Sequence, residues 1–275
     1  MSRIWWCATG PLAFLPIHAA GIYATSITKA GPILSDFAIS SYIPNVRALS
    51  ERVVNSPQVL NKRGKKKTTV FMISQPETPN LPCIPGTTKE VLTIMQLLKN
   101  HSVQFLCLEG EVATVNQGLA YMETHSCIHF ACHAHQNTKE PLESRFILYN
   151  GGLKLSDIIK RNFEGADLAY LSACQTSTGD EKLSEEAVHL AAGMLAAGYQ
   201  SVVATMWSIS DQYGPQVAED FYAKLLSQDL EPELEQLSGL STDNAARALH
   251  YSTQKLRKQL GDSALDWIPY VHFGL

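Results

Sequence analysis

Two stretches of the sequence, CIHFACHAH at residues 127–135 and LAYLSACQTSTGD at residues 168–180, decide which fold the chain adopts. Each begins with an apolar run of strand length and ends in polar, chemically reactive side chains. A continuous apolar run, unlike an alternating one, is typical of a strand covered on both faces of its sheet. We therefore expect two neighbouring central strands with reactive side chains at their ends.

The rest of the chain alternates strand-like and helix-like segments around these two. Thr68–Ser74, Val103–Leu108 and Ser201–Met206 are apolar runs of strand length, and Thr88–Lys99 has apolar residues at helical spacing. Further helical patterns cover 46–54, 114–124, 155–162, 185–197, 215–227 and 243–259, and further strand-like segments are 3–8, 39–43, 145–149 and 270–273. Such alternation predicts an α/β fold with a mostly parallel central sheet flanked by helices.

Composition argues against two classes of partner. The chain has 275 residues, 45% of them hydrophobic, and 26 acidic against 22 basic residues give a net charge of −4. A nucleic-acid binder usually presents a basic face, and the one basic run here, 62–67, is expected to be a solvated loop. No apolar stretch approaches the roughly 20 residues that span a bilayer. We therefore expect neither nucleic acid nor a membrane as partner.

The cysteines and the N-terminus favour a cytoplasmic protein. Six cysteines in 275 residues are too sparse for a disulfide scaffold, and no CxxC pair suggests a zinc ribbon or a redox site. Cys7, Cys107, Cys127 and Cys132 lie in apolar runs and are expected to be buried thiols. Prolines and a histidine interrupt the apolar residues 1–24, unlike the core of a signal peptide. We expect a reducing cytosol and no cofactor.

Polar residues at the strand ends provide a nucleophile and a base. His133 closes one apolar strand and Cys174 the other, 41 residues later, a separation that leaves room for one helix between two adjacent strands. A thiol must become a thiolate to attack a carbonyl, and a nearby imidazole can accept its proton. Because the residues after Cys174 are polar and turn-forming, we expect both side chains to face one solvent-accessible edge of the sheet.

The motifs around these residues resemble those of the CHAT domain family, cysteine peptidases of the caspase–separase clan. The matching segments are HFACHA (129–134), LSACQTSTG (171–179), the helix at 186–198, VVATMWSISD (202–211), the C-terminal 267–274, and the early 10–12 and 15–19. The likeness covers nearly the whole chain.

This resemblance implies a caspase-like three-layer sandwich, with residues 1–65 as an N-terminal strand and helix segment and 66–275 as the catalytic core. It makes His133 the general acid/base and Cys174 the nucleophile, with the backbone N–H groups of Cys174 and Ala134 as oxyanion hole. Ala134 stands where caspases have glycine, so a positive φ there would be strained.

The resemblance also suggests substrate-binding residues. Separase-like enzymes choose a basic residue before the scissile bond, and a buried Asp211 would favour Arg or Lys there. The alternative is that Asp211 caps the helix beginning near Tyr213. Trp207 is expected to pack at a pocket wall or in the core, with stacking on a ligand as the alternative. His129, four residues before the candidate base, is expected to be buried and structural.

Three functions remain open from the sequence. The first is a cysteine endopeptidase that cleaves a protein substrate. For this enzyme the resemblance to the CHAT family implies a role in regulated cell death or defence signalling, with an activating sensor or repeat domain as partner. The second is a catalytically silent CHAT scaffold. The third is a metal-dependent hydrolase using His129, His133 and His135, with or without Cys132, although no carboxylate stands among them.

Overall fold

The computed structural model describes most of the chain. The described residues are 1–24, 29–47, 50, 68–137, 139–161, 163, 165–175, 186–227, 240, 242–261 and 263–275, with the backbone alone for 14, 173–175, 186–189 and 264. The basic run at 62–67 lies outside them, as does most of the helix predicted at 46–54.

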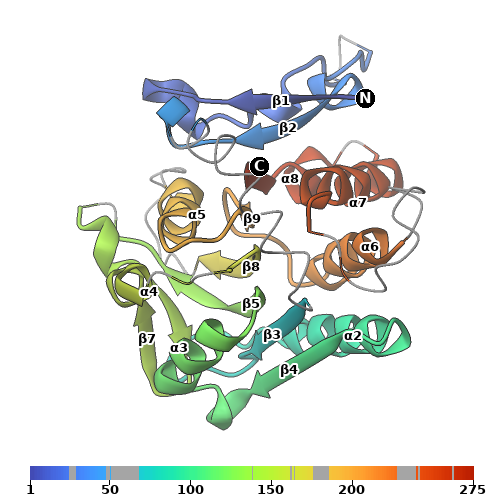
Figure 1. Cartoon of the computed structure of the whole chain (residues 1–275). Coiled ribbons are helices and arrows are strands. Elements are labelled where there is room, and N and C mark those ends of the chain that lie inside the picture. Colours follow the sequence, from blue (N-terminus) through green and yellow to red (C-terminus); the bar gives the residue numbers. More distant parts are fainter. Residues whose placement is uncertain are drawn as a thin grey trace.

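A ten-stranded sheet runs through the molecule in the order β1-β2-β10-β9-β8-β5-β3-β4, with β6 and β7 attached beside β5 (Figure 1). The strands are β1 (Ser2–Trp6), β2 (Ala38–Tyr42), β3 (Thr69–Ser74), β4 (Gln104–Glu109), β5 (Cys127–His135), β6 (Arg145–Leu148), β7 (Gly151–Lys154), β8 (Leu168–Gln175), β9 (Ser201–Thr205) and β10 (Tyr270–Gly274). Most described pairs are parallel, as predicted, while β10 with β9, β5 with β6 and β6 with β7 are antiparallel.

Helices cover both faces of this sheet, which confirms the three-layer α/β sandwich (Figure 1). One face packs against α3 (Val115–Thr124), α4 (Leu155–Arg161) and α5 (Glu186–Ala196). The other packs against α2 (Gly86–Asn100), α6 (Gly214–Leu226), α7 (Ala245–Leu260) and the short α8 (Ala264–Trp267).

Strand β5 shows why the central runs are continuously apolar. Ile128 and Phe130 belong to the core on the α3 face, whereas Cys127 and Ala131 belong to the core on the α2 face. Because successive side chains point to opposite faces, both sets must be apolar for the strand to be buried on both sides. The same rule holds for the other central strands.

One strand was not predicted from the sequence. After the predicted strand at 145–149, Gly151–Lys154 forms strand β7, paired with β6. A side chain at Gly152 would collide with Arg145 across this pair, so glycine is needed there for close approach. Strand β5 also continues past His133, which was expected to close it, to His135, because β6 pairs with its end.

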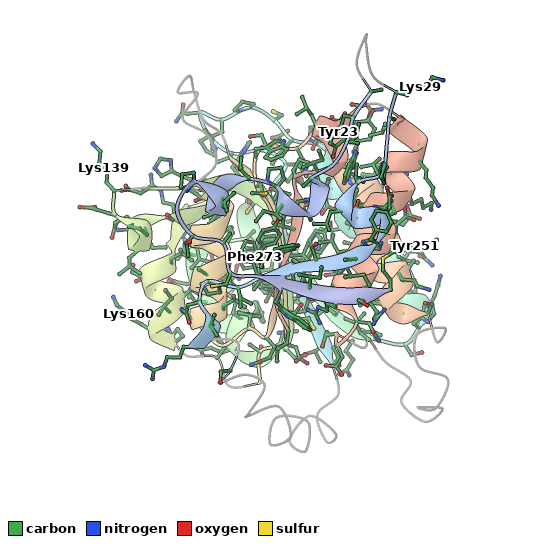
Figure 2. The ribbon with its side chains drawn as sticks, turned by 90° about the horizontal axis from the view of Figure 1, so that it is seen from above. Tyr23, Lys29, Lys139, Lys160, Tyr251 and Phe273 are labelled. Atoms are coloured by element: carbon green, nitrogen blue, oxygen red, sulfur yellow. The ribbon has the colours of Figure 1, made fainter. Side chains whose placement is uncertain are left out.

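The N-terminal strands β1 and β2 belong to the same sheet. Strand β2 meets β10 through a single described pair, Tyr42 with Phe273, and Figure 2, which looks down on these strands, shows Phe273 beside them. Polar contacts add to this junction: Trp5 Nε1 donates to the carbonyl oxygen of Gly274 over 3.1 Å. The N-terminal segment is therefore joined to the rest by both backbone and side-chain contacts.

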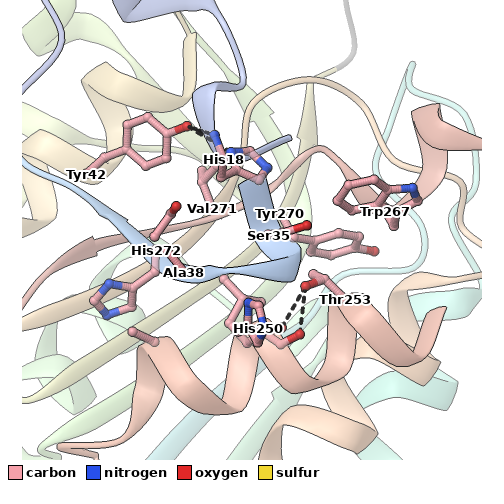
Figure 3. A pocket seen from close by; sticks show the side chains of 13 residues that line it. His18, Ser35, Ala38, Tyr42, His250, Thr253, Trp267, Tyr270, Val271 and His272 are labelled. Atoms are coloured by element: carbon pink, nitrogen blue, oxygen red, sulfur yellow. Dashed lines mark hydrogen bonds between the residues drawn. The ribbon is translucent and has the colours of Figure 1, made fainter. Parts of the chain in front are cut away.

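A cavity of about 30 Å³ lies between the N-terminal segment, α7 and β10 (Figure 3). His18 borders it, with Nε2 2.9 Å from the carbonyl oxygen of Ile268 and Nδ1 2.8 Å from the hydroxyl of Tyr42. A carbonyl only accepts, so Nε2 carries the hydrogen and Nδ1 accepts from Tyr42. Burial lowers the pKa of His18 to about 4.

Acid should therefore loosen this junction. Between about pH 6.5 and 4 the unfolded chain binds a proton at residue 18 that the folded chain does not, so stability present at neutral pH is lost as the pH falls. The loss from this group reaches about 3 kcal/mol. Denaturant unfolding from pH 7 to pH 4 should show a shallower pH dependence in His18→Asn than in the unsubstituted protein. Parallel curves would contradict this assignment.

Two further observations concern the chain as a whole. Among the described residues, none of Cys7, Cys83, Cys107, Cys127 and Cys132 forms a disulfide. No helix in the described ranges is both long and apolar enough to cross a bilayer.

Candidate active site

Strands β5 and β8 lie side by side and in parallel, as predicted, and their register pairs the two candidate catalytic positions directly. The Cα partner of His133 on β5 is Cys174 on β8. Both lie inside their strands rather than just beyond them, because β5 continues to His135 and β8 to Gln175. The backbone thus brings the predicted base and nucleophile together, while the Cys174 side chain lies outside the described part.

His133 is held by a backbone carbonyl. Its Nε2 lies 2.8 Å from the carbonyl oxygen of Pro82, in the loop between β3 and α2. A carbonyl cannot donate, so Nε2 carries the hydrogen of this bond. Nδ1 is buried and makes no hydrogen bond to the residues that the structure describes. The neutral imidazole therefore keeps a lone pair on Nδ1, the form that can take a proton from a thiol.

The ring of His133 is buried, with the residue only 2% exposed. The expectation of an imidazole open to solvent is therefore wrong for this side chain. We attribute the burial to the loop between β3 and α2, whose Pro82 contacts the ring. From the sequence this segment was expected only to connect the strand and the helix. In this arrangement the loop shields the candidate base from water.

The end of β8 has one edge without a β9 partner. The described pairing of β8 with β9 ends at Tyr170 and Val203, four residues before Cys174. On the other edge, Ala134 of β5 pairs with both Gln175 of β8 and Phe146 of β6. The N–H of Cys174 and of Ala134 as an oxyanion hole remains a prediction.

The conformational strain expected at Ala134 is absent. Among the described non-glycine residues, positive φ occurs at Asn80 and Ser102, so Ala134 is not in that region. The physical reason is that β5 continues through it, which keeps its backbone extended. Alanine is therefore compatible with the backbone conformation at this position.

The exposure and the contact of Asp211 differ from both predictions. It is exposed rather than buried, and its Oδ2 accepts a hydrogen bond from the backbone N–H of Gly86 over 2.8 Å. Gly86 is the first residue of α2, so Asp211 does not cap α6, whose N-cap residue Tyr213 has no side-chain cap. The aspartate follows β9 as expected, but it contacts a helix that sequence analysis did not connect with it.

Trp207 is half-buried and packs against the apolar cores on both faces of the sheet. Its Nε1 lies 3.4 Å from the carbonyl oxygen of Leu265. These contacts fit packing at a pocket wall or in the core, the first of the roles expected for Trp207.

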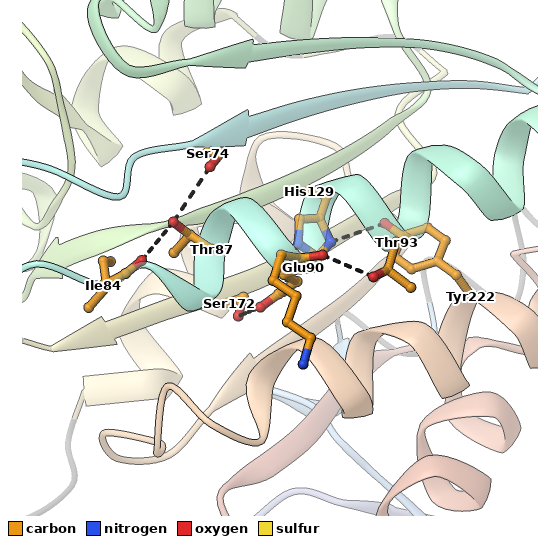
Figure 4. A network of polar contacts seen from close by, with 9 residues as sticks. Ser74, Ile84, Thr87, Glu90, Thr93, His129, Ser172 and Tyr222 are labelled. Atoms are coloured by element: carbon orange, nitrogen blue, oxygen red, sulfur yellow. Dashed lines mark hydrogen bonds and ion pairs between the residues drawn. The ribbon is translucent and has the colours of Figure 1, made fainter.

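His129, on β5 four residues before His133, is fully buried, as predicted, and Figure 4 shows it beside Glu90. Its Nε2 lies 2.8 Å from Glu90 Oε1, a contact of proximity rather than an aligned hydrogen bond, and its ring stacks on Tyr170 at 4.7 Å. Ser172 donates to the other oxygen of Glu90 over 3.0 Å, and the Tyr222 hydroxyl lies 3.3 Å from Nδ1. Glu90 thus links β5 and β8 from α2.

Glu90 was not among the residues expected at the site, although the sequence contains a signal for it. It stands four residues before Ile94, on the helix face whose Val91, Ile94 and Leu98 are buried. A carboxylate on an apolar helical face is expensive to bury without a partner, so its presence indicates a polar partner on the sheet.

The geometry does not support a metal site on β5. Nε2 of His129 faces the carboxylate of Glu90, and His135 is exposed opposite Arg145. Within the described residues no three His, Cys, Asp or Glu side chains are arranged to hold a metal ion. The third function therefore loses its geometric basis.

Two solved structures have folds similar to that of this chain. A structure of Porphyromonas gingivalis RgpB pro- and mature domains superposes with a TM-score of 0.55 and 11% identity, over 86% of this chain and 55% of that one. The Saccharomyces cerevisiae separase of a separase–securin complex gives 0.52 and 15% identity, over 88% of this chain and 14% of that one. Both have caspase-like folds, and this chain shares that fold.

The family follows from the sequence. The family model of the CHAT domain matches residues 1–274, so the chain belongs to the CHAT domain family. A search of curated proteins finds no match. The chain spans about half the length of the RgpB chain and about a seventh of the separase chain.

Proposed function

We propose that the chain is a cysteine endopeptidase in which Cys174 is the nucleophile and His133 the general acid/base. The observation that carries the proposal is the direct cross-strand pairing of these two residues at one end of the sheet. The hydrogen bond from His133 Nε2 to Pro82 supports it, because it leaves Nδ1 able to accept a proton.

The reaction follows from these roles. Nδ1 of His133 takes the thiol proton of Cys174, and the thiolate adds to the carbonyl carbon of the scissile peptide bond. Backbone N–H groups at the ends of β5 and β8 stabilise the oxyanion. The protonated imidazole then gives its proton to the leaving amine, and water hydrolyses the resulting thioester with His133 as base.

The wider setting is part of the same proposal. The family resemblance favours a role in regulated cell death or defence signalling, in the cytosol, with a protein substrate and a sensor or repeat domain that activates the chain. The burial of His133 fits an activation requirement, because a ring that is 2% exposed must become accessible when substrate binds.

The same burial favours one alternative, a catalytically silent CHAT module that only binds partners. A buried imidazole can contribute to core packing just as well as it can to catalysis. The two functions differ in whether residue 174 reacts faster than an ordinary thiol.

A peptide reagent with a thiol-reactive ketone warhead tests this. If the proposal is right, mass spectrometry of the labelled chain will find the adduct on Cys174, and His133→Gln will slow the labelling by at least about a hundredfold, the range of acid–base assistance. Cys83, which is exposed, serves as an internal reference thiol that a small alkylating agent modifies in both variants. Labelling of Cys174 no faster than that of Cys83, in samples with and without a candidate activator, would favour the silent module.

A further inference from the structure

The contact between Asp211 and Gly86 joins two segments 125 residues apart. One is the segment after β9, and the other is the start of α2. Neither function proposed for Asp211 from sequence requires this contact. It therefore needs an explanation of its own.

Gly86 is adapted to this contact. A Cβ atom at this position would lie 2.5 Å from the carbonyl oxygen of Asp211 and closer still to its Oδ1. Positive φ does not account for the glycine, since residue 86 is not among the described glycines with positive φ. The absence of a side chain thus serves the close approach of the two segments.

The start of α2 also needs a hydrogen-bond acceptor. Its N-cap residue is Pro85, which has no side-chain cap, and its first turn holds no acidic residue. The first N–H groups of a helix have no partner within it, and the positive end of the helix dipole favours a carboxylate. Asp211 supplies this cap from a distant segment.

The capped turn leads directly to the carbonyl that holds His133. Pro82 lies four positions before Gly86, and Ile84 between them makes hydrogen bonds through both its N–H and its carbonyl oxygen. Its N–H donates to the carbonyl oxygen of Pro76 over 2.9 Å, and its own carbonyl oxygen accepts from Thr87 Oγ1 over 2.9 Å. These bonds join the loop that contains Pro82 to the first turn of α2.

We infer that Asp211 is a positioning residue, which fixes the loop 75–85 so that the carbonyl of Pro82 orients the imidazole of His133. The inference rests on the proposed function only in giving His133 a catalytic role. Oδ2 of Asp211 is engaged in this bond and the side chain is exposed. A substrate cation at this carboxylate would be screened by water and salt, unlike one in a buried pocket.

Three variants separate positioning from substrate selection. Asp211→Ala removes the acceptor, Asp211→Asn keeps an oxygen acceptor but loses the charge, and Gly86→Ala forces the segments apart while leaving the aspartate intact. A positioning role requires an acceptor, so Asn should largely rescue Ala. Selection of a basic substrate residue requires the charge, so Asn should fail as Ala does.

The first readout is the imidazole ¹⁵N spectrum of His133, assigned by its loss in His133→Gln. In the unsubstituted protein we expect the Nε2–H form. Asp211→Ala and Gly86→Ala should shift both ring nitrogens or mix the tautomers, and Asp211→Asn should change them little. Asp36→Asn is the matched control, because Asp36 also accepts a backbone N–H, that of Ile33 over 2.9 Å, in the N-terminal segment. It should leave the His133 signals unchanged.

The second readout is cleavage of paired peptides with arginine or a neutral residue before the scissile bond. Asp211→Ala and Gly86→Ala should lower kcat about 10- to 100-fold for both peptides, with KM little changed. Loss confined to the arginine peptide, equal in the Ala and Asn variants, would overturn the inference. So would an unchanged His133 spectrum in folded Asp211→Ala. If no peptide is cleaved and Cys174 is not labelled, the proposed function fails, while the spectra still decide the positioning role.

Discussion

Replacing Cys174 by alanine should reduce peptide cleavage by about 10⁴-fold or more, because no other group in the proposed mechanism forms the covalent intermediate. The fold should be retained, since alanine is accommodated in a strand and β8 is paired along its length with β5. The measurement is single-turnover cleavage of a peptide that the unsubstituted chain processes, with thermal unfolding to show that the variant is folded.

Substitutions at His133 and at Cys7 test whether the activity depends on the proposed catalytic pair. His133→Gln should lose nearly as much activity, and the double variant should be no worse than either single one, because the two residues act as a unit. Cys7→Ser is the matched control: Cys7 follows β1, at the far end of the sheet order from β5 and β8, and should retain full activity. Residual cleavage by Cys174→Ala within tenfold of the unsubstituted chain would assign the activity to another group.

The second large effect is expected in stability rather than in chemistry. Glu90→Ala should cost about 3–5 kcal/mol of the free energy of unfolding, because it leaves His129 and Ser172 without their shared partner in the core. Glu90 and His129 are both almost fully buried, so water cannot replace the carboxylate. For a chain of this size, the loss corresponds to a fall of roughly 10 °C in Tm.

Two further variants, one conservative and one at an exposed site, test whether the loss of stability comes from the buried network. Glu90→Gln keeps the shape and an acceptor for Ser172, so it should cost less, about 1–3 kcal/mol. Glu123→Ala removes an exposed partner of Arg161, with 44% of the Glu123 side chain accessible, and should cost no more than about 1 kcal/mol. Equal losses in the Glu90→Ala and Glu123→Ala variants would show that the buried network contributes no special stability.

Much of the sheet was predictable because its signals are local. An apolar run such as Leu168–Ala173 identifies a buried strand without reference to any other segment, and β8 lies there. The adjacency of β5 and β8 followed from the short distance along the chain between them. Strand β7 was missed because two glycines usually indicate a turn, whereas here the missing side chain at Gly152 makes room for Arg145.

The surroundings of the candidate site were less predictable, because they depend on contacts between distant segments. Pro82 lies 51 residues from His133, and Gly86 lies 125 residues from Asp211. Neither a proline carbonyl nor a helix-starting N–H has a side-chain signature that a periodic pattern can reveal. The burial of His133, which contradicts the expected open ring, follows from the first of these contacts.

The amino-acid order alone determined the layered α/β architecture and its family, and it selected one imidazole and one thiol as candidate catalytic groups, since strand periodicity and short motifs act over a few residues. Only the tertiary structure decided which atoms surround that imidazole: a loop carbonyl on Nε2, a helix whose glutamate bridges two strands, and an aspartate on the first N–H of that helix. These contacts arise when the layers close, because hydrogen bonding and burial depend on distances in space rather than along the chain.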